Sequence, residues 1–261
     1  MQIVAVTIPI YKLSLDPIEQ MSLKQCFNVL HKYPIIFFAP KSLNVSWYEA
    51  HCASLGSFTI ERFDDDYFSG IPGYNRLMLS KEFYRRFDRF EYILIYQVDA
   101  FVFRDELEYW CKQGYHYIGA PYAFVDMDAY PMKVLTKFRK ALKVMQKIIP
   151  SFYRFKQVGN GGLSLRHIKK TLWLLNFKKL QPKLWEIVME DNFFQYWGNI
   201  MFLFFKLPDE KTAAHFSIEL EPERTYKWID NKLPTFCHAF MRYEHAFWKP
   251  HIEKEGYKIN E

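Results

Sequence analysis

The sequence has few of the features that anchor or cross-link a protein. No two of its four cysteines have the CxxC spacing of a zinc site, and we expect free thiols in a reducing cytosol. Its longest apolar runs, such as IMFLFF, are far shorter than the ~20 residues that cross a bilayer. The opening MQIVAVTIPIYK lacks a basic region and a small-residue cleavage site, so it predicts a core strand rather than a signal peptide. We therefore expect a cytoplasmic protein that does not cross the membrane. The cysteines are Cys26, Cys52, Cys111 and Cys237.

Motifs that identify several protein classes are also missing. Neither GxGxxG nor GxxxxGK[ST] occurs, so the sequence lacks the main evidence for a dinucleotide-binding or P-loop protein. No helix-turn-helix, RRM or zinc signature occurs, which makes nucleic-acid binding the weakest of the classes considered. There is no internal repeat and no low-complexity segment, and 261 residues are enough for one domain with a substantial core.

Aromatic residues and basic charge are well represented. Aromatics make up 19% of the chain, and although most are expected in the core, such rings also stack on the flat faces of sugars and nucleotides. The net charge of +6 fits an anionic partner such as a nucleotide diphosphate or a lipid headgroup, without choosing among them.

The first hundred residues alternate between predicted strands and helices. Asp16 caps one expected helix, whose first residue is Pro17, and the next helix is capped by Ser46 and ended by Gly56. This alternation indicates βαβ units and an α/β fold, with a Rossmann-like, mostly parallel sheet flanked by helices. The predicted strands cover 3–10, 34–40, 58–63, 92–103 and the start of 115–124; the predicted helices cover 16–33, 46–56, 73–87 and 184–202.

Three loop features fall at the carboxyl ends of these strands, where parallel sheets bind their ligands. They are the turn at Pro9–Tyr11, the acidic segment 63–70 and Asp99. A buried carboxylate without a partner is costly, so Asp99 either caps a turn or binds a ligand. In the second case it is a candidate ligand for Mg²⁺ or Mn²⁺, which prefer oxygen and keep bound phosphates and water.

The segment VGNGGLSLR contains three of the ten glycines of the chain. Gly159, Gly161 and Gly162 surround Asn160. Glycine allows close approach of the backbone to a ligand, or a positive φ. The segment is therefore either a binding loop, which we favour, or an ordinary tight turn.

The segment MEDNFF places two acids in an apolar context. Glu190 and Asp191 lie between Met189 and two phenylalanines. A partly buried carboxylate has a raised pKa and can act as a general base. The alternative is a solvated helix face, and this segment alone favours neither reading.

Two late histidines, His238 and His245, lie among aromatic residues. Histidines in such surroundings are more often structural. Either could instead complete a metal site with Asp99.

The segment 131–156 is basic and has its apolar residues at helical spacing. Such a helix is typical of proteins that bind a membrane surface or a partner, although a core-packed helix with a solvated basic face is common. We expect an anionic membrane surface as its partner.

Taken in order, several segments resemble a bacterial glycosyltransferase-like family, domain of unknown function 5672, and are similar to galactosyltransferase-like enzymes of the GT-A type. The segments lie between residues 73 and 240. They are GYNRLMLSKEFY, YILIYQVDAFVF, YIGAPY, VGNGGLSLR, EDNFF and CHAF.

The resemblance implies roles for individual residues. Asp191 is the implied general base and Glu190 its neighbour, which holds the acceptor, while Asp99 and His238 are the implied ligands of Mn²⁺ or Mg²⁺. Gln97 stands where the first Asp of the DxD motif is expected; its amide can bind a ribose hydroxyl but brings no charge. The implied donor-binding residues are Pro9, Tyr11, Tyr74, Asn75, Arg76, Gln97, Asp99, Asn160, Gly161 and Gly162.

The resemblance also implies an organisation and an activity. One GT-A domain would comprise a nucleotide-sugar-binding half (1–125), a basic helical insertion (126–156) and an acceptor-binding, catalytic half (157–261). It would transfer a sugar from a UDP-sugar to a hydroxyl of a glycan or lipid-linked acceptor, with inversion, in the synthesis of a bacterial surface polysaccharide. The alternative is a binding module of the same fold that has lost turnover, for which Gln97 is the main support.

Overall fold

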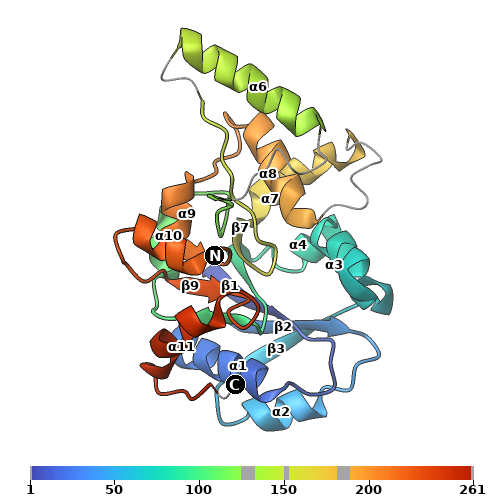
Figure 1. Ribbon diagram of the computed structural model, residues 1–261. Coiled ribbons are helices and arrows are strands. Elements are labelled where there is room, and N and C mark those ends of the chain that lie inside the picture. The colour runs from blue at the N-terminus through green and yellow to red at the C-terminus, as the bar shows by residue number, and fades with distance from the viewer. Residues whose placement is uncertain (1, 125–132, 150–152, 181–188, 260–261) are drawn as a thin grey trace.

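A computed structural model describes residues 2–124, 133–149, 153–180 and 189–259 (Figure 1). Its central sheet has six strands in the order β3-β2-β1-β4-β7-β6. The first four are mutually parallel, whereas β7 runs antiparallel to both of its neighbours. The expected α/β fold with a mostly parallel sheet is confirmed. The strands are β1 (Gln2–Pro9), β2 (Ile35–Pro40), β3 (Phe58–Phe63), β4 (Phe90–Tyr96), β6 (Tyr117–Gly119) and β7 (Leu163–His167).

The sheet is buried on both faces, which explains its continuous apolar strands. All six residues of β2 are buried, and from Tyr92 to Tyr96 the residues of β4 alternate between two hydrophobic clusters on opposite faces. Helix α1 (Pro17–Leu30) begins with the expected cap, because Asp16 and Glu19 form a capping box. The prediction that Ser46 caps the next helix is wrong. Helix α2 (Ser46–Cys52) has Val45 as its N-cap residue, and the Ser46 N–H donates to the Asn44 side chain.

The helix expected over 73–87 is two helices, α3 (Gly70–Met78) and α4 (Lys81–Arg85). Ser80 causes the break, because its hydroxyl accepts the N–H of Phe83 and starts a new helix. Ahead of α3, the acidic segment forms the 3₁₀ turn η1 (Asp65–Phe68).

The strand expected over 92–103 is also wrong in its extent. The chain leaves β4, turns at Gln97–Asp99 and enters β5 (Ala100–Val102), which belongs to a second sheet in the order β5-β9-β8. Ala100 pairs directly with His238 at the end of β9 (Phe236–His238). Asp99 therefore lies at the junction of the two sheets rather than inside a strand. The third strand of this sheet is β8 (Ser217–Ile218).

Of the remaining helices, α6, α7 and α8 form the upper part of the molecule in Figure 1, where α6 lies farthest from the central sheet, whereas α11 lies in the lower part beside α1. The helix expected over 131–156 is shorter, because α6 ends at Ile148; 150–152 lie outside the described residues. The predicted helix over 184–202 falls partly outside them, and α8 begins at Glu190. In the described part of the chain, no helix is long and apolar enough to span a membrane. The remaining helices have the following bounds: α5 (Leu107–Lys112), α6 (Lys133–Ile148), α7 (Ile168–Leu174), η3 (Leu175–Leu180), α8 (Glu190–Ile200), α9 (Glu210–Phe216), α10 (Pro222–Trp228) and α11 (His245–Glu253).

Candidate functional site

The candidate site lies where β4 ends and the second sheet begins. His238 ends β9 and faces Asp99, with its Nε2 atom 3.1 Å from the Asp99 Oδ1. Its other ring nitrogen, Nδ1, is 3.2 Å from the carboxylate of Glu219, which follows β8. Burial lowers the pKa of His238, but the carboxylates of Asp99 and Glu219 outweigh it and raise that pKa to about 10. Burial alone would raise the pKa of Asp99, but the charge of His238 outweighs burial, and the pKa of Asp99 is lowered overall.

The facing atoms of this pair suit a divalent cation. Asp99 Oδ1 and His238 Nε2 are buried, and neither has a hydrogen-bond partner of good geometry despite their close approach. Adjacent ligands of an octahedral cation, each at ~2.1 Å, lie about 3 Å apart, close to the observed separation. Glu219 behind His238 also matches the carboxylate that commonly orients a metal-binding imidazole. Asp99 and His238 could therefore hold Mn²⁺ or Mg²⁺.

Asp99 and His238 supply two ligands, fewer than the six of an octahedral cation. Within the described residues, no group of three His, Cys, Asp or Glu side chains could hold a metal alone. His245 begins α11, and no described contact joins it to Asp99. Of the two histidines considered from the sequence, His238 is the one beside Asp99.

The glycine loop packs against the side chains of the site. Its backbone is held at Gln97, whose N–H donates to the Gly162 carbonyl at 2.9 Å. A Cβ atom at Gly162 would collide with His238 and Gln97, and one at Gly161 would collide with Glu190. The glycines thus make room for the protein's own functional groups, a reason that the sequence could not reveal.

Asn160 organises this loop in the left-handed conformation, with φ of 74°. Its side-chain oxygen accepts the N–H groups of Gly162 and Leu163, at 3.0 and 3.2 Å. Its own N–H donates to Asp191 at 3.1 Å. The side-chain nitrogen of Asn160 is buried without a partner, so one donor remains for a bound molecule.

Asp191 is buried in the first turn of α8 and accepts three hydrogen bonds. Tyr122 Oη donates to its Oδ2 at 2.5 Å, together with the Asn160 N–H, and the Asn192 N–H donates to its Oδ1 at 2.8 Å. Burial raises the pKa of the Asp191 carboxyl, and these hydrogen bonds oppose that rise. The solvated helix face considered from the sequence is thus excluded for Asp191, and its raised pKa suits a general base.

Glu190 is also buried, and it pairs with a buried arginine. Arg166 Nη2 donates to Glu190 Oε1 at 2.8 Å, and the two side chains are 0% and 2% exposed. The guanidinium also donates to Tyr84 and Ser164 and lies over the Phe194 ring, so its buried charge is well solvated by the protein. Burial raises the pKa of Glu190, and Arg166 opposes that rise. The second oxygen, Oε2, has no hydrogen-bond partner.

The other expected donor-binding residues divide into two groups. Asn75 and Arg76 bind the protein itself: Asn75 Oδ1 accepts the N–H of Glu190 at 3.0 Å, and Arg76 donates to the Asp66 carbonyl at 2.7 Å. Tyr11 is 56% exposed beside Pro9, at the carboxyl end of β1. The Tyr74 hydroxyl is buried without a hydrogen bond and remains able to bind a ligand.

Three residues of the site were not singled out from the sequence. Arg166 ends the segment VGNGGLSLR and Tyr122 ends the segment YIGAPY, and alternation along the strand could have suggested an inward-facing Arg166. Glu219 carries no such signal, because only the pairing of β8 with β9 brings it near His238.

These features define a protein with the GT-A glycosyltransferase fold. One solved structure that it resembles is mouse xyloside xylosyltransferase 1 in its apo form, with a TM-score of 0.52, 10% identity, and coverage of 90% of this chain and 96% of that one. Another is the apo glycosyltransferase GlyE of Streptococcus pneumoniae TIGR4, with a TM-score of 0.49, 11% identity, and coverage of 92% and 54%.

The family is identified by sequence. Residues 57–238 match the model of the protein family of unknown function DUF5672, and the chain belongs to this family. The expected family resemblance is thus confirmed. No curated protein matches the chain.

Proposed function

We propose that this protein transfers a sugar from a nucleotide-sugar, a UDP-sugar, to a hydroxyl of a glycan or lipid-linked acceptor in the synthesis of a bacterial surface polysaccharide. The observation that carries the proposal is the placement of Asp191, a buried carboxylate with a raised pKa, against the glycine loop that also contacts His238 of the Asp99–His238 pair. A general base and a pair that binds the diphosphate, both packed against one loop, would supply the two functions that sugar transfer requires.

Each residue has a part in this reaction. Asp191 removes the proton of the acceptor hydroxyl as its oxygen attacks the anomeric carbon, and Glu190 orients the acceptor. With one base and no separate nucleophile, direct displacement inverts the anomeric configuration. Asp99 and His238 would hold the cation, which would supply positive charge to stabilise the departing diphosphate.

The activity is tested with a library of UDP-, GDP- and CMP-sugars in the presence of Mn²⁺, assayed for released nucleotide with a range of glycan acceptors. One donor class should respond, and the anomeric configuration of the product decides between inversion and retention. Nucleotide binding without turnover on any pair would favour the second candidate, a binding module that has lost catalysis. That candidate is supported by Gln97, whose neutral amide replaces the first carboxylate of the DxD motif.

Removal of the cation ligands gives a prediction for binding. Mn²⁺ with UDP, supplied at about 100 times the dissociation constant, should raise the melting temperature by roughly 5–10 °C. Asp99→Asn should abolish this shift, because it removes the carboxylate that faces the Nε2 atom of His238. Glu219→Gln should weaken the apparent Mn²⁺ affinity about 10–100-fold, because Glu219 orients the His238 ring. Thermal unfolding over a Mn²⁺ titration measures both effects.

The matched control is Asp64→Asn, which removes an exposed carboxylate that pairs with Lys41. It should leave the Mn²⁺ response unchanged. An undiminished Mn²⁺ shift in Asp99→Asn would show that the cation binds elsewhere.

We also propose that α6 contacts an anionic membrane surface. Val144 and Ile148 are 57% and 71% exposed on this helix, and Lys140, Lys143 and Lys147 are exposed beside them. Apolar side chains flanked by lysines are typical of helices that lie in the headgroup region. The position of α6 far from the central sheet leaves this helix accessible (Figure 1).

Reversal of these charges should weaken binding to liposomes that contain anionic lipid. Each lysine near such a surface contributes about 1 kcal/mol, so replacing Lys140, Lys143 and Lys147 by glutamate should weaken binding more than about 100-fold. Co-sedimentation measures the effect. The charge-matched control replaces Lys227, Lys232 and Lys254 by glutamate, and equal losses in both variants would rule out a specific role for α6.

A further inference from the structure

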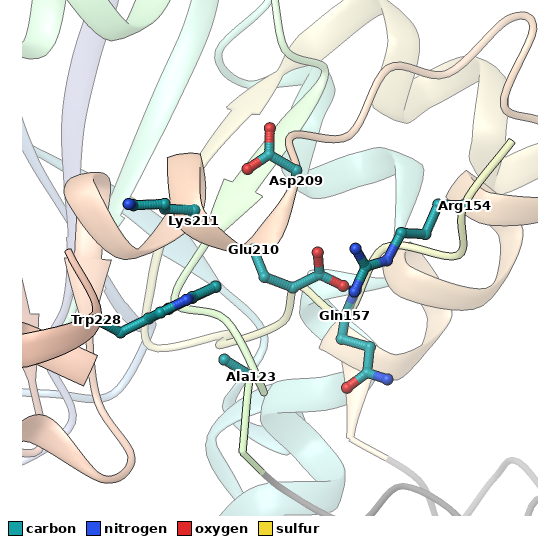
Figure 2. Close-up of a pocket in the computed structure, with 7 residues that line it drawn as sticks. All are labelled: Ala123, Arg154, Gln157, Asp209, Glu210, Lys211 and Trp228. Atoms are coloured by element: carbon teal, nitrogen blue, oxygen red, sulfur yellow. The ribbon is translucent and has the colours of Figure 1, made fainter. Parts of the chain in front are cut away.

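A groove with a tryptophan at one end lies beside the candidate base. Figure 2 shows its main pocket, a cavity of about 290 Å³, with Trp228 on one side and Arg154, Gln157 and Glu210 grouped on the other. A second hollow of about 250 Å³ shares Arg154, Gln157 and Glu210 and extends to Gln146 on α6. The two hollows are neighbours, because they share three lining residues, and together they are called the groove. The first alone is near the ~300 Å³ at which small-molecule pockets begin.

The groove is joined to Asp191 through a short pair of extended segments. Pro121 pairs with Val158, and the Tyr122 N–H donates to the Gln157 carbonyl at 2.9 Å. Tyr122 contacts Asp191, and the next residue, Ala123, lines the groove. The groove therefore begins one residue away from the side chain that holds the candidate base.

The chemistry of the lining is that of a hydroxyl-binding surface. Trp228 is 37% exposed, with the edge-on ring of Phe124 beside it, so an aromatic surface remains open to a ligand. Among the described residues, Arg154 makes no hydrogen bond or ion pair, and Glu210 uses only Oε1, which accepts the Gln157 N–H at 2.9 Å. A planar guanidinium and a carboxylate oxygen can each bind vicinal hydroxyls, and an aromatic face packs on the C–H face of a sugar ring.

The other charged side chains of the main pocket are already engaged by neighbouring residues. Lys211 pairs with Asp230, and both carboxylate oxygens of Asp209 accept hydrogen bonds from Thr212. The main pocket is lined by two acids and two bases, so the end of the groove that holds Trp228 has no net charge to attract an anion; Lys143 lines the second hollow. This balance favours a neutral ligand over a nucleotide or a phosphate.

We propose that the groove binds the non-reacting sugars of a neutral oligosaccharide acceptor, with one ring on Trp228 and its hydroxyls on Arg154 and Glu210. The inference rests on the proposed function, in which Asp191 is the base, because the terminal sugar of the acceptor reaches Asp191 past Tyr122. The groove shares no residue with the Asp99–His238 pair, which is assigned to the donor.

The test measures oligosaccharide binding without donor, by ligand-observed saturation-transfer NMR. The probes are di- to hexasaccharides of neutral hexoses and N-acetylhexosamines, with hexuronate oligosaccharides as the acidic arm. Trp228→Ala and, separately, Arg154→Leu should each weaken binding of a neutral oligosaccharide about tenfold or more. Tyr109→Ala, which removes another exposed aromatic ring from α5, should leave binding unchanged. Thermal unfolding confirms that the variants remain folded.

Each result then supports or overturns the inference. Equal binding by the wild type and Trp228→Ala, binding of hexuronates alone, or binding of no oligosaccharide at all would overturn it. Oligosaccharide binding that depends on Trp228, without turnover of any donor, would leave the groove established and the proposed transfer wrong. Sugar transfer by Trp228→Ala with an unchanged kcat/KM for the acceptor would support the proposed transfer and overturn the role of the groove.

Discussion

Asp191→Asn is expected to lower the rate of sugar transfer by about 10²–10⁴-fold, the usual contribution of a general base. The amide cannot take up the acceptor proton, yet its oxygen can still accept the Tyr122 hydroxyl and the Asn160 N–H. The amide nitrogen would then face the Asn192 N–H, so a modest loss of stability should accompany the loss of rate. Initial rates with the responsive donor and acceptor measure the effect.

The pH profile separates a base from a purely structural carboxylate. The pKa of Asp191 lies above its ordinary value because of burial, so the wild-type rate should rise with pH through that raised pKa as the carboxylate ionises. For stability the sign is opposite: the raised pKa favours the folded state below the unfolded-state pKa, and this contribution is lost as pH rises through the folded-state pKa. Asp64→Asn, in an exposed ion pair, should change neither profile. A fully active Asp191→Asn variant would exclude Asp191 as the base.

Arg166→Leu is expected to cost about 3–5 kcal/mol of stability, the largest structural effect that we predict. Arg166 and Glu190 are almost completely buried, and removing the guanidinium leaves a carboxylate in a low-dielectric interior without its partner. The same change removes the donors to Tyr84 and Ser164. Urea unfolding measures the loss.

The double variant Arg166→Leu/Glu190→Leu distinguishes a lost charge pair from lost packing. Because removing both charges leaves neither unpaired, it should be more stable than Arg166→Leu. The matched control is Arg86→Leu, which breaks an exposed pair with Glu61 and should cost only about 0–1 kcal/mol. A loss below about 1 kcal/mol in Arg166→Leu would contradict a buried, partner-dependent Glu190.

The parts of this structure that could be predicted from sequence depend on local patterns. Apolar strands and the Asp16 cap predicted the alternation of the first hundred residues, and the acids in MEDNFF were recognised by their apolar context. Boundaries at Ser80 and Asp99 were missed, because an apolar run does not show where a chain leaves one sheet for another. The partners of the site depend on long-range pairing: Tyr122 meets Asp191, and Glu219 meets His238, only in the folded chain.

The pairing of β5 with β9 has a consequence for how the site is assembled. Ala100 lies opposite His238, so the spacing between Asp99 and His238 is determined by a ladder between distant segments of the chain rather than by a flexible loop. The two residues therefore cannot face each other until the C-terminal part has folded against the rest. The ability to bind a cation should appear only late in refolding, and it would report whether the whole chain has reached its native arrangement.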